Sequence, residues 1–180
     1  KCLDHAQQRL KDLSCKVILR QANFSSLSEE VAKQGIEKAD LIIADIGICS
    51  AQLTDADKGL SFQENMRLDM RLDNRLKTNA ADIVNGADEK DLSDIIYNFG
   101  QERASRKIAR SIVEYRQARP ITSTEQLSNI ICRATKQSPT ARKGRIHPAT
   151  KTFQALRIAV NAELDSLGKF LADAPDVLAQ

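Results

Sequence analysis

Two short apolar runs near the start of the chain have the pattern of β-strands. Residues 41–44 (Leu-Ile-Ile-Ala) are continuously apolar, which favours a strand covered on both faces of a mainly parallel sheet. Residues 16–22 also predict a strand, and residues 25–34 between the two predict a helix that Ser25 or Ser26 caps. A strand, a helix and a strand with short connections form a βαβ unit, so this part predicts a parallel sheet.

An aspartate and a glycine come directly after the second apolar run. In open α/β sheets ligands bind outside the carboxyl ends of the strands, so Asp45 would lie where such a fold keeps its site. Gly47 would let the backbone turn sharply or approach a ligand closely. An Asp45 that starts a turn or caps the next helix is the alternative that the residues leave open.

After about Thr54 the pattern changes: residues 55–73 are polar and irregular, and no further strand is predicted up to about Ser138. Residues 101–119 predict an amphipathic helix that Pro120 ends, with an apolar face and an opposite basic face. The basic residues of this face and of the later loop are Arg103, Arg106, Lys107, Arg110, Arg142, Lys143, Arg145 and Lys151. A solvated helix face would explain the first four, but the basic loop favours contact with the phosphates of a nucleic acid.

Further helices are predicted on either side of this basic helix. Residues 88–99 have an acidic first turn, and the capping-box pattern at residues 122–125 starts another helix. Pro148 suits the first turn of a last long helix, which Pro175 ends. The apolar stripe of that helix predicts core packing and comprises Phe153, Leu156, Val160, Leu164, Leu167 and Leu171. The pair Asn-Gly at residues 85–86 predicts a turn.

Composition narrows the class of protein. The chain has 180 residues, of which 42% are hydrophobic and 28% charged, so it can form a packed domain, alone or with a smaller insertion. Only 4% are aromatic and none is Trp, which argues against a nucleic-acid platform of stacked rings. The net charge is +3. There is no signal-like start and no long apolar run, so we expect a cytoplasmic protein that does not enter a membrane.

The residues that most often bind metals or react covalently give a weak signal. The four cysteines lack C-x-x-C spacing, and only two histidines could join them, so no metal site is predicted. The cysteines indicate free thiols of a reduced protein. His147, before a proline and a helix, is expected to cap or pack rather than catalyse. Asp69 and Asp73, with Arg71 between them, fit either a salt-bridged turn or the rim of an active site.

Several motifs occur in a specific order along the chain. Residues 45–53 are Asp-Ile-Gly-Ile-Cys-Ser-Ala-Gln-Leu, and further motifs lie at residues 58–62, 68–73, 97–110 and 143–161. They resemble the motifs of the RsmH/MraW family, S-adenosylmethionine-dependent methyltransferases that modify the N4 amine of a cytidine in 16S ribosomal RNA. The resemblance covers essentially the whole chain.

The resemblance implies a fold and a division into two domains. The family has a Rossmann-like methyltransferase domain interrupted by an all-helical insertion, which agrees with the change of pattern near Thr54. By the resemblance, residues 1–55 and 150–180 would form an incomplete methyltransferase domain of the α/β class. Residues 56–149 would form the helical insertion, which is expected to recognise RNA.

The resemblance also implies site residues. Phe24, Asp45 and Gln52 would contact S-adenosyl-L-methionine, and Asp45 would also orient the cofactor or accept a hydrogen of the amine. The RNA-binding residues would be Arg103, Arg106, Lys107, Arg110, Arg142, Lys143 and Arg145, and their partner the 16S rRNA or the small ribosomal subunit. Whether the protein forms a homodimer stays open.

Departures from the family keep a rival interpretation open. The Gly-rich turn that receives the methionine part of the cofactor and the acidic residue that binds its ribose are both absent from this sequence. The proline of the family signature is Ala51 here. The alternative is therefore a non-catalytic RNA-binding or assembly module.

Overall fold

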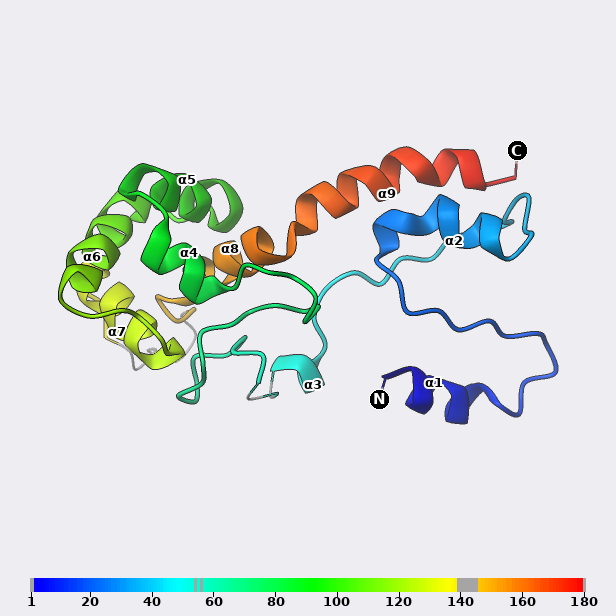
Figure 1. Ribbon diagram of the computed structural model, residues 1–180, viewed down its shortest axis with the longest axis horizontal. Coiled ribbons are helices and arrows are strands. Elements are labelled where there is room, and N and C mark those ends of the chain that lie inside the picture. Colours follow the sequence, from blue (N-terminus) through cyan, green and yellow to red (C-terminus); the bar gives the residue numbers. More distant parts are fainter. Residues whose placement is uncertain (1, 54, 56, 139–145, 180) are drawn as a thin grey trace. The chain divides into compact units, whose positions relative to one another are not determined.

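The chain forms two compact units in a computed structural model that describes residues 2–53, 55, 57–138 and 146–179 (Figure 1). One unit comprises residues 1–44 with 164–180, and the other comprises residues 45–163. We describe each unit by itself, and call the second the helical unit. Three of the predicted RNA-binding residues, Arg142, Lys143 and Arg145, lie outside the described residues.

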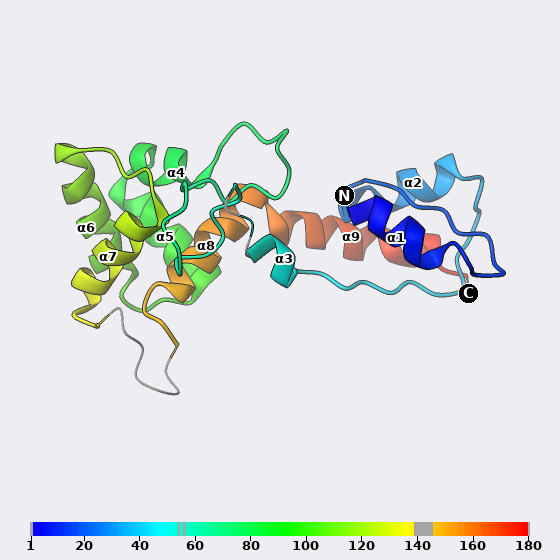
Figure 2. The ribbon, with the colours of Figure 1, turned by 90° about the horizontal axis from the view of Figure 1, so that it is seen from below.

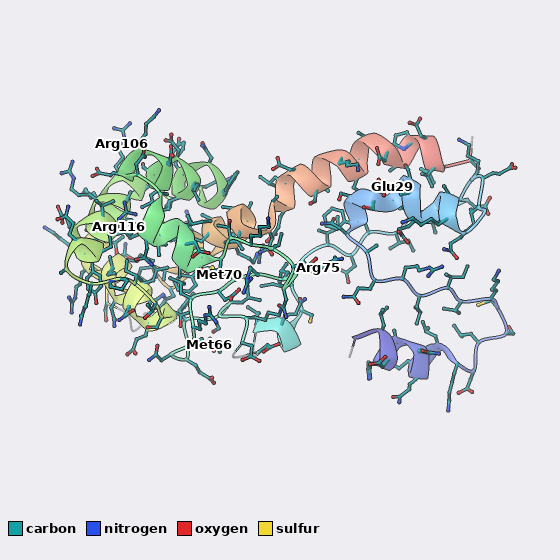
Figure 3. All side chains as sticks on the ribbon, in the orientation of Figure 1. Glu29, Met66, Met70, Arg75, Arg106 and Arg116 are labelled. Carbon is teal, nitrogen blue, oxygen red and sulfur yellow. The ribbon has the colours of Figure 1, made fainter. Side chains whose placement is uncertain are left out.

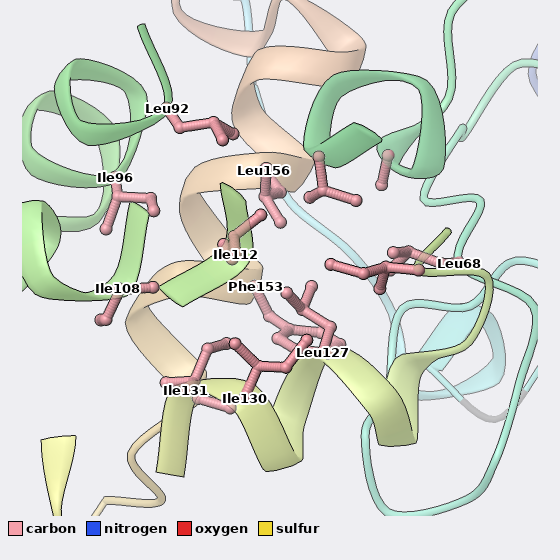
Figure 4. Packing of buried hydrophobic residues seen from close by; sticks show 14 of the residues in the cluster. Leu68, Leu92, Ile96, Ile108, Ile112, Leu127, Ile130, Ile131, Phe153 and Leu156 are labelled. Carbon is pink, nitrogen blue, oxygen red and sulfur yellow. The ribbon is translucent and has the colours of Figure 1, made fainter. Parts of the chain in front are cut away.

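The helical unit contains most of the apolar core. Its helices are α3 (Ser50–Leu53), α4 (Ala80–Gly86), α5 (Glu89–Gly100), α6 (Ser105–Ala118), α7 (Thr124–Thr135) and α8 (Thr150–Asn161). Helix α5 packs against both α8 and α6, and α6 packs against α7, as the two perpendicular views show (Figures 1 and 2). Their facing side chains interlock in the core (Figure 4). Leu92, Ile108, Ile112, Leu127 and Leu156 are completely buried, and each such side chain contributes about 1.5–3 kcal/mol.

Capping side chains fix where these helices begin. Asn79 and Asp82 form a reciprocal capping box at α4, and the Asp88 side chain accepts the Asp91 N–H at the start of α5. At α7 the capping box consists of Ser123 and Gln126, one residue later than the predicted pattern at 122–125. Each N-cap contributes about 1 kcal/mol, so these polar residues set the helix boundaries.

The predicted turn at residues 85–86 is wrong, because Asn85 and Gly86 are the last two residues of α4. The Asn85 amide makes two bonds to the backbone of Ile121. Its Oδ1 accepts the Ile121 N–H and its Nδ2 donates to the Ile121 carbonyl, both at 2.8 Å. This pair of tertiary bonds, 36 residues apart in sequence, holds Asn85 in the helix.

The other unit contains α1 (Cys2–Leu10), the short 3-10 helix η1 (Phe24–Ser26), α2 (Leu27–Lys33) and most of α9 (Glu163–Val177). The single long helix predicted from Pro148 is divided into α8 and α9 at Ala162, which is left-handed (φ 46°). Pro175 lies inside α9 rather than ending it. The predicted apolar stripe is buried at Phe153, Leu156 and Val160 in α8. In α9 two of its residues, Leu164 and Leu171, are exposed.

The predicted β-strands at residues 16–22 and 41–44 are wrong, since the described part of the chain contains helices and no strand. Leu41 and Ile43 are 71% and 83% exposed. Ala39 alone forms an isolated parallel bridge to Leu178, with its N–H donating to the Val177 carbonyl at 2.8 Å.

The physical reason lies in the hydrogen bonds of the backbone. A helix pairs its own N–H and C=O groups, whereas a strand needs a neighbouring strand to pair them. Beyond the Ala39 bridge, the described residues offer no such neighbour to residues 41–44. The described structure is therefore all-helical instead of the predicted α/β arrangement. Among its helices none has the length and apolar character that crossing a membrane requires.

Candidate functional site

Two of the predicted cofactor residues lie on one turn of the helical unit. Asp45 is exposed and begins the turn, and Gly47 has a positive φ of 145°. The side chain of Gln52 closes the turn, because its Oε1 accepts the Cys49 N–H at 3.0 Å. A glutamine in the first turn of α3 that bonds back to the residue before the helix is half of a capping box. Gln52 thus fixes the start of α3, which follows the segment that presents Asp45.

The backbone at Gly47 is open. No atom lies within 4 Å of the place where a Cβ would stand, so a ligand could approach the chain there. Beside it the turn offers one exposed carboxylate, from Asp45, and one side-chain amide, from Gln52. Hydroxyl, amine and ring nitrogen groups such as those of S-adenosylmethionine can bond to a carboxylate and an amide. The polar groups of the turn therefore fit the expected cofactor.

Phe24, the third predicted cofactor residue, lies in the other unit. Its ring is half-buried and meets Phe170 of α9 edge to face, with the centroids 5.8 Å apart. Ser26 occupies the N-cap position of α2, one of the two positions that the sequence predicts, but its side chain makes no capping bond. Asn23 caps the preceding η1, where its Oδ1 accepts the Ser25 N–H at 3.0 Å. Asp45 and Gln52 belong to the helical unit, so a meeting of Phe24 with them stays a prediction.

The segment from Lys58 to Leu76 follows this turn and is held by close backbone packing. Gly59 has a φ of 58°, and a Cβ there would lie 1.9 Å from the carbonyl oxygen of Arg67. The Met70 N–H donates to the Lys58 carbonyl at 2.7 Å. Only glycine can occupy position 59 without moving the backbone. The segment is therefore a compact, preformed loop, in which Met66 and Met70 are buried (Figure 3).

Two aspartate–arginine pairs within this loop answer the question that the sequence left open. Asp69, only 6% exposed, binds Arg71 through Nε and Nη2 at 2.7 and 2.8 Å. Hydrogen bonding by the Arg71 side chain holds the pKa of Asp69 below its ordinary value. Asp73 pairs with Arg75 instead, whose hydrogen bonds lower the pKa of Asp73 to about 2. The loop is thus salt-bridged locally, with each aspartate bound to the arginine two residues later.

Asn161 ties this loop to the helical core. Its Oδ1 accepts the Leu72 N–H and its Nδ2 donates to the Met70 carbonyl, both at 2.8 Å. Met70 adopts the left-handed conformation (φ 65°) with its side chain completely buried. Sequence reasoning missed Asn161, Arg75 and this role of Met70. Arg75 is two residues after Asp73 and could have been found, but Asn161 is too distant in sequence to give a signal.

The predicted basic face exists on and next to α6. Arg103, Arg106, Lys107 and Arg110 are all exposed. Arg106 lies on the outer side of the helical unit (Figure 3). Arg110 forms an exposed ion pair with Glu89 at 3.6 Å, which water and salt weaken. These side chains are placed to meet an anion, although their binding of RNA stays a prediction.

His147 packs, as the sequence predicts. Its ring stacks on Phe62, with the centroids 4.4 Å apart. Its Nδ1 accepts the Ala149 N–H at 3.1 Å, which fixes the turn before α8. Phe62 also meets Phe153 of the core edge to face at 5.0 Å. His147 thus links the preformed loop to the start of α8.

Comparison with known proteins gives a match over the whole chain. The MraW methylase family matches residues 1–180. The ribosomal RNA small subunit methyltransferase H of Solibacter usitatus is 45% identical over 176 residues, which are 98% of this chain and 59% of that relative. The protein of the same name from Synechococcus elongatus is 48% identical over 174 residues, 97% of this chain and 55% of the relative. The chain therefore spans little more than half the length of these curated relatives.

Proposed function

The chain belongs to the MraW methylase family, and on that premise we propose that its protein transfers a methyl group from S-adenosyl-L-methionine to the N4 amine of a cytidine in 16S rRNA. The observation that carries the proposal is the match over residues 1–180, which includes the turn from Asp45 to Gln52. The name of the matched relatives, ribosomal RNA small subunit methyltransferase H, supplies the substrate class. Such a reaction belongs in the bacterial cytoplasm.

The proposed reaction is an in-line displacement. When bound, S-adenosylmethionine supplies a methyl group on a positively charged sulfur. The cytidine N4 nitrogen forms a bond to the methyl carbon as the carbon–sulfur bond breaks, and the amine must then lose a proton. The lone pair of this nitrogen is delocalised into the ring, so alignment and a proton acceptor would supply the catalysis.

We assign the acceptor or orienting role to Asp45. Its carboxylate is exposed at the start of the turn, beside the open backbone of Gly47. Gln52 would help by keeping the turn closed through its bond to the Cys49 N–H. Phe24 would contribute a ring surface to the cofactor. Residues 56–149 would recognise RNA, with phosphates on Arg103, Arg106, Lys107 and Arg110 and on the basic residues 142, 143 and 145.

The direct test has two parts. Isothermal titration of the 180-residue chain with S-adenosylmethionine should give saturable binding, which Gln52→Ala should weaken and Gln154→Ala, on an exposed position of α8, should not. The protein that contains this chain should place N4-methylcytidine in unmodified 16S rRNA, detected by mass spectrometry of the nucleosides. Absence of the methylated nucleoside with a folded protein and labelled cofactor would contradict the proposal.

The second candidate is an RNA-binding or assembly module without catalysis, which the exposed basic face of α6 favours. It predicts RNA binding without cofactor binding. In both cases the basic face should contact phosphates. Replacing Arg103, Arg106 and Arg110 by Gln should change the binding of single-stranded RNA. The slope of log affinity against log salt concentration should fall by about 2, since each phosphate contact contributes about 0.7. An unchanged dependence would remove these residues from the interface.

A further inference from the structure

A surface groove runs through the helical unit where the α5–α6 connection, the end of α7 and the start of α8 meet. Its wider part has a volume of about 400 Å³ and its narrower part about 110 Å³. Glu102, Thr135 and Gln137 line both parts, so the two are continuous. All lining residues belong to the same compact unit.

Lysines from three different elements line the groove. Lys107 comes from α6, Lys136 caps the end of α7, and Lys151 lies in the first turn of α8. None of the three forms an ion pair with another described residue. Glu102 is the acid on the described walls, and its Oε1 already accepts the Ala104 N–H at 2.8 Å. The groove therefore has excess positive charge.

The backbone strengthens this preference for an anion. Helices α6 and α8 both begin at the groove, and their N-cap residues are Ala104 and Ala149. The N–H groups of Ala104 and Ser105 are paired with Glu102, and those of Ala149 and Thr150 with His147. This leaves the next two N–H groups of each helix to donate to an anion, and the helix dipole favours negative charge there. At the end of α7 the carbonyl of Cys132 is already paired with the N–H groups of Lys136 and Gln137.

We infer that this groove binds the phosphodiester backbone of single-stranded RNA, with Lys107, Lys136 and Lys151 as phosphate contacts. The inference rests on the proposed function, which makes RNA the partner. It adds Lys136 to the basic residues that the sequence indicated, and it places Lys107, Lys136 and Lys151, from three elements, on one groove. A recessed groove between three elements suits a flexible single strand, whereas the exposed outer face of α6 would suit either a strand or a duplex. Lys107 belongs to both surfaces.

The test compares two double variants that remove equal charge from the 180-residue chain. Lys136→Gln with Lys151→Gln changes the groove, and Lys77→Gln with Lys90→Gln changes exposed lysines that do not line it. Fluorescence anisotropy would measure binding of a labelled single-stranded RNA 12-mer over a series of KCl concentrations. The groove variant should reduce the slope of log affinity against log salt by about 1.4, at about 0.7 for each contact, and the control variant should not change it.

Lys151 also donates to the Gln101 carbonyl at 3.2 Å, so its replacement could disturb the fold. Lys136→Gln alone avoids this problem and should reduce the slope by about 0.7. Thermal unfolding followed by circular dichroism would establish that all variants are folded.

The outcomes separate the groove from the proposed function. The groove would not be the RNA-binding site if the slope of log affinity against log salt were the same for the wild type and both groove variants. The same conclusion would follow if the groove and control double variants lost equal amounts of slope. Neither result would contradict RNA binding by the chain. A groove variant that lost binding to a polyglutamate peptide but kept its RNA slope would assign the groove to an acidic protein segment. A folded wild-type chain that bound no RNA would overturn the groove. The proposed function would be overturned separately, if the protein that contains this chain placed no N4-methylcytidine in 16S rRNA.

Discussion

The helical unit and residues 41–44 contain the same kinds of apolar side chain, but only the helical unit buries them. In the helical unit, Leu156 and Ile112 are completely buried, whereas Leu41 and Ile43 are mostly exposed. The difference follows from the backbone. Each helix satisfies its own hydrogen bonds and needs only to bury one face, while an apolar strand needs partner strands before it can bury anything. Local apolar pattern therefore predicted the helices far better than the strands.

The largest contrast should appear when a leucine is shortened in each region. Leu156→Ala should lower the free energy of unfolding by about 3 kcal/mol, because it leaves a cavity in a closed core. Leu41→Ala, at an exposed position, should change it by less than about 0.5 kcal/mol. Urea denaturation followed by circular dichroism measures both. A large cost at Leu41 would show that residues 41–44 are buried in solution.

Replacing Asp45 should reduce activity and leave stability unchanged. Asp45→Asn should reduce methyl transfer to 16S rRNA by at least about 100-fold if the carboxylate accepts the amine proton, while the unfolding midpoint of this chain stays the same. Asp40→Asn is the matched control, because Asp40 is also an exposed carboxylate and lies shortly before Asp45 in the sequence. Full turnover by the Asp45→Asn protein would exclude the acceptor role.

Asn161 tests how firmly the core holds the loop from Lys58 to Leu76. Asn161→Ala should cost about 2 kcal/mol of unfolding free energy, because it leaves the Leu72 N–H and the Met70 carbonyl without a partner. Gln154→Ala, exposed on the same helix, should cost less than about 0.5 kcal/mol. Similar urea midpoints for these two variants would mean that Asn161 does not anchor the loop.

The smallest expected effect is the pH dependence from Asp69. Arg71 lowers the pKa of Asp69 in the folded protein below the ordinary value of 3.8, so the unfolded chain takes up the proton first as pH falls. The stabilisation is fully present above that ordinary value and is lost as pH falls through the lowered pKa. Asp69→Asn should therefore lower the free energy of unfolding at neutral pH. It should also reduce the loss of unfolding free energy as the pH falls into the acid range.

Urea denaturation at several pH values between 2 and 7 would measure this effect, with Asp94→Asn on the exposed face of α5 as the control. If the free energy of unfolding of the Asp69→Asn protein fell with pH as steeply as that of the wild type, the pair of Asp69 with Arg71 would not contribute to acid unfolding.

The sequence predicted features whose partners are close along the chain. The basic face of α6 followed from side chains at i, i+3, i+4 and i+7, and a salt-bridged turn at Asp69 and Arg71 was one of the two alternatives that the sequence left open. Features that depend on distant partners were missed. Asn85 has the local character of a turn residue, yet its bonds to Ile121 place it in a helix.

The same reasoning explains what was predictable about the candidate site. The turn from Asp45 to Gln52 is local, so its motif could be identified and its closing bond is short-range. The groove joins residues 102–107, 134–137 and 146–151, which no periodicity connects. Only the packing of α6, α7 and α8 brings its lysines to one surface.

Gly59 has a consequence for natural variation in this chain. Its positive φ and the carbonyl oxygen 1.9 Å from a would-be Cβ exclude every side chain on two independent grounds. Gly86, where nothing lies within 4 Å, has no such restriction. In a saturation-mutagenesis library selected for folded protein, codon 59 should return almost only glycine, while codon 86 should return many residues. Survival at these two codons would therefore report on loop closure without any assay of activity.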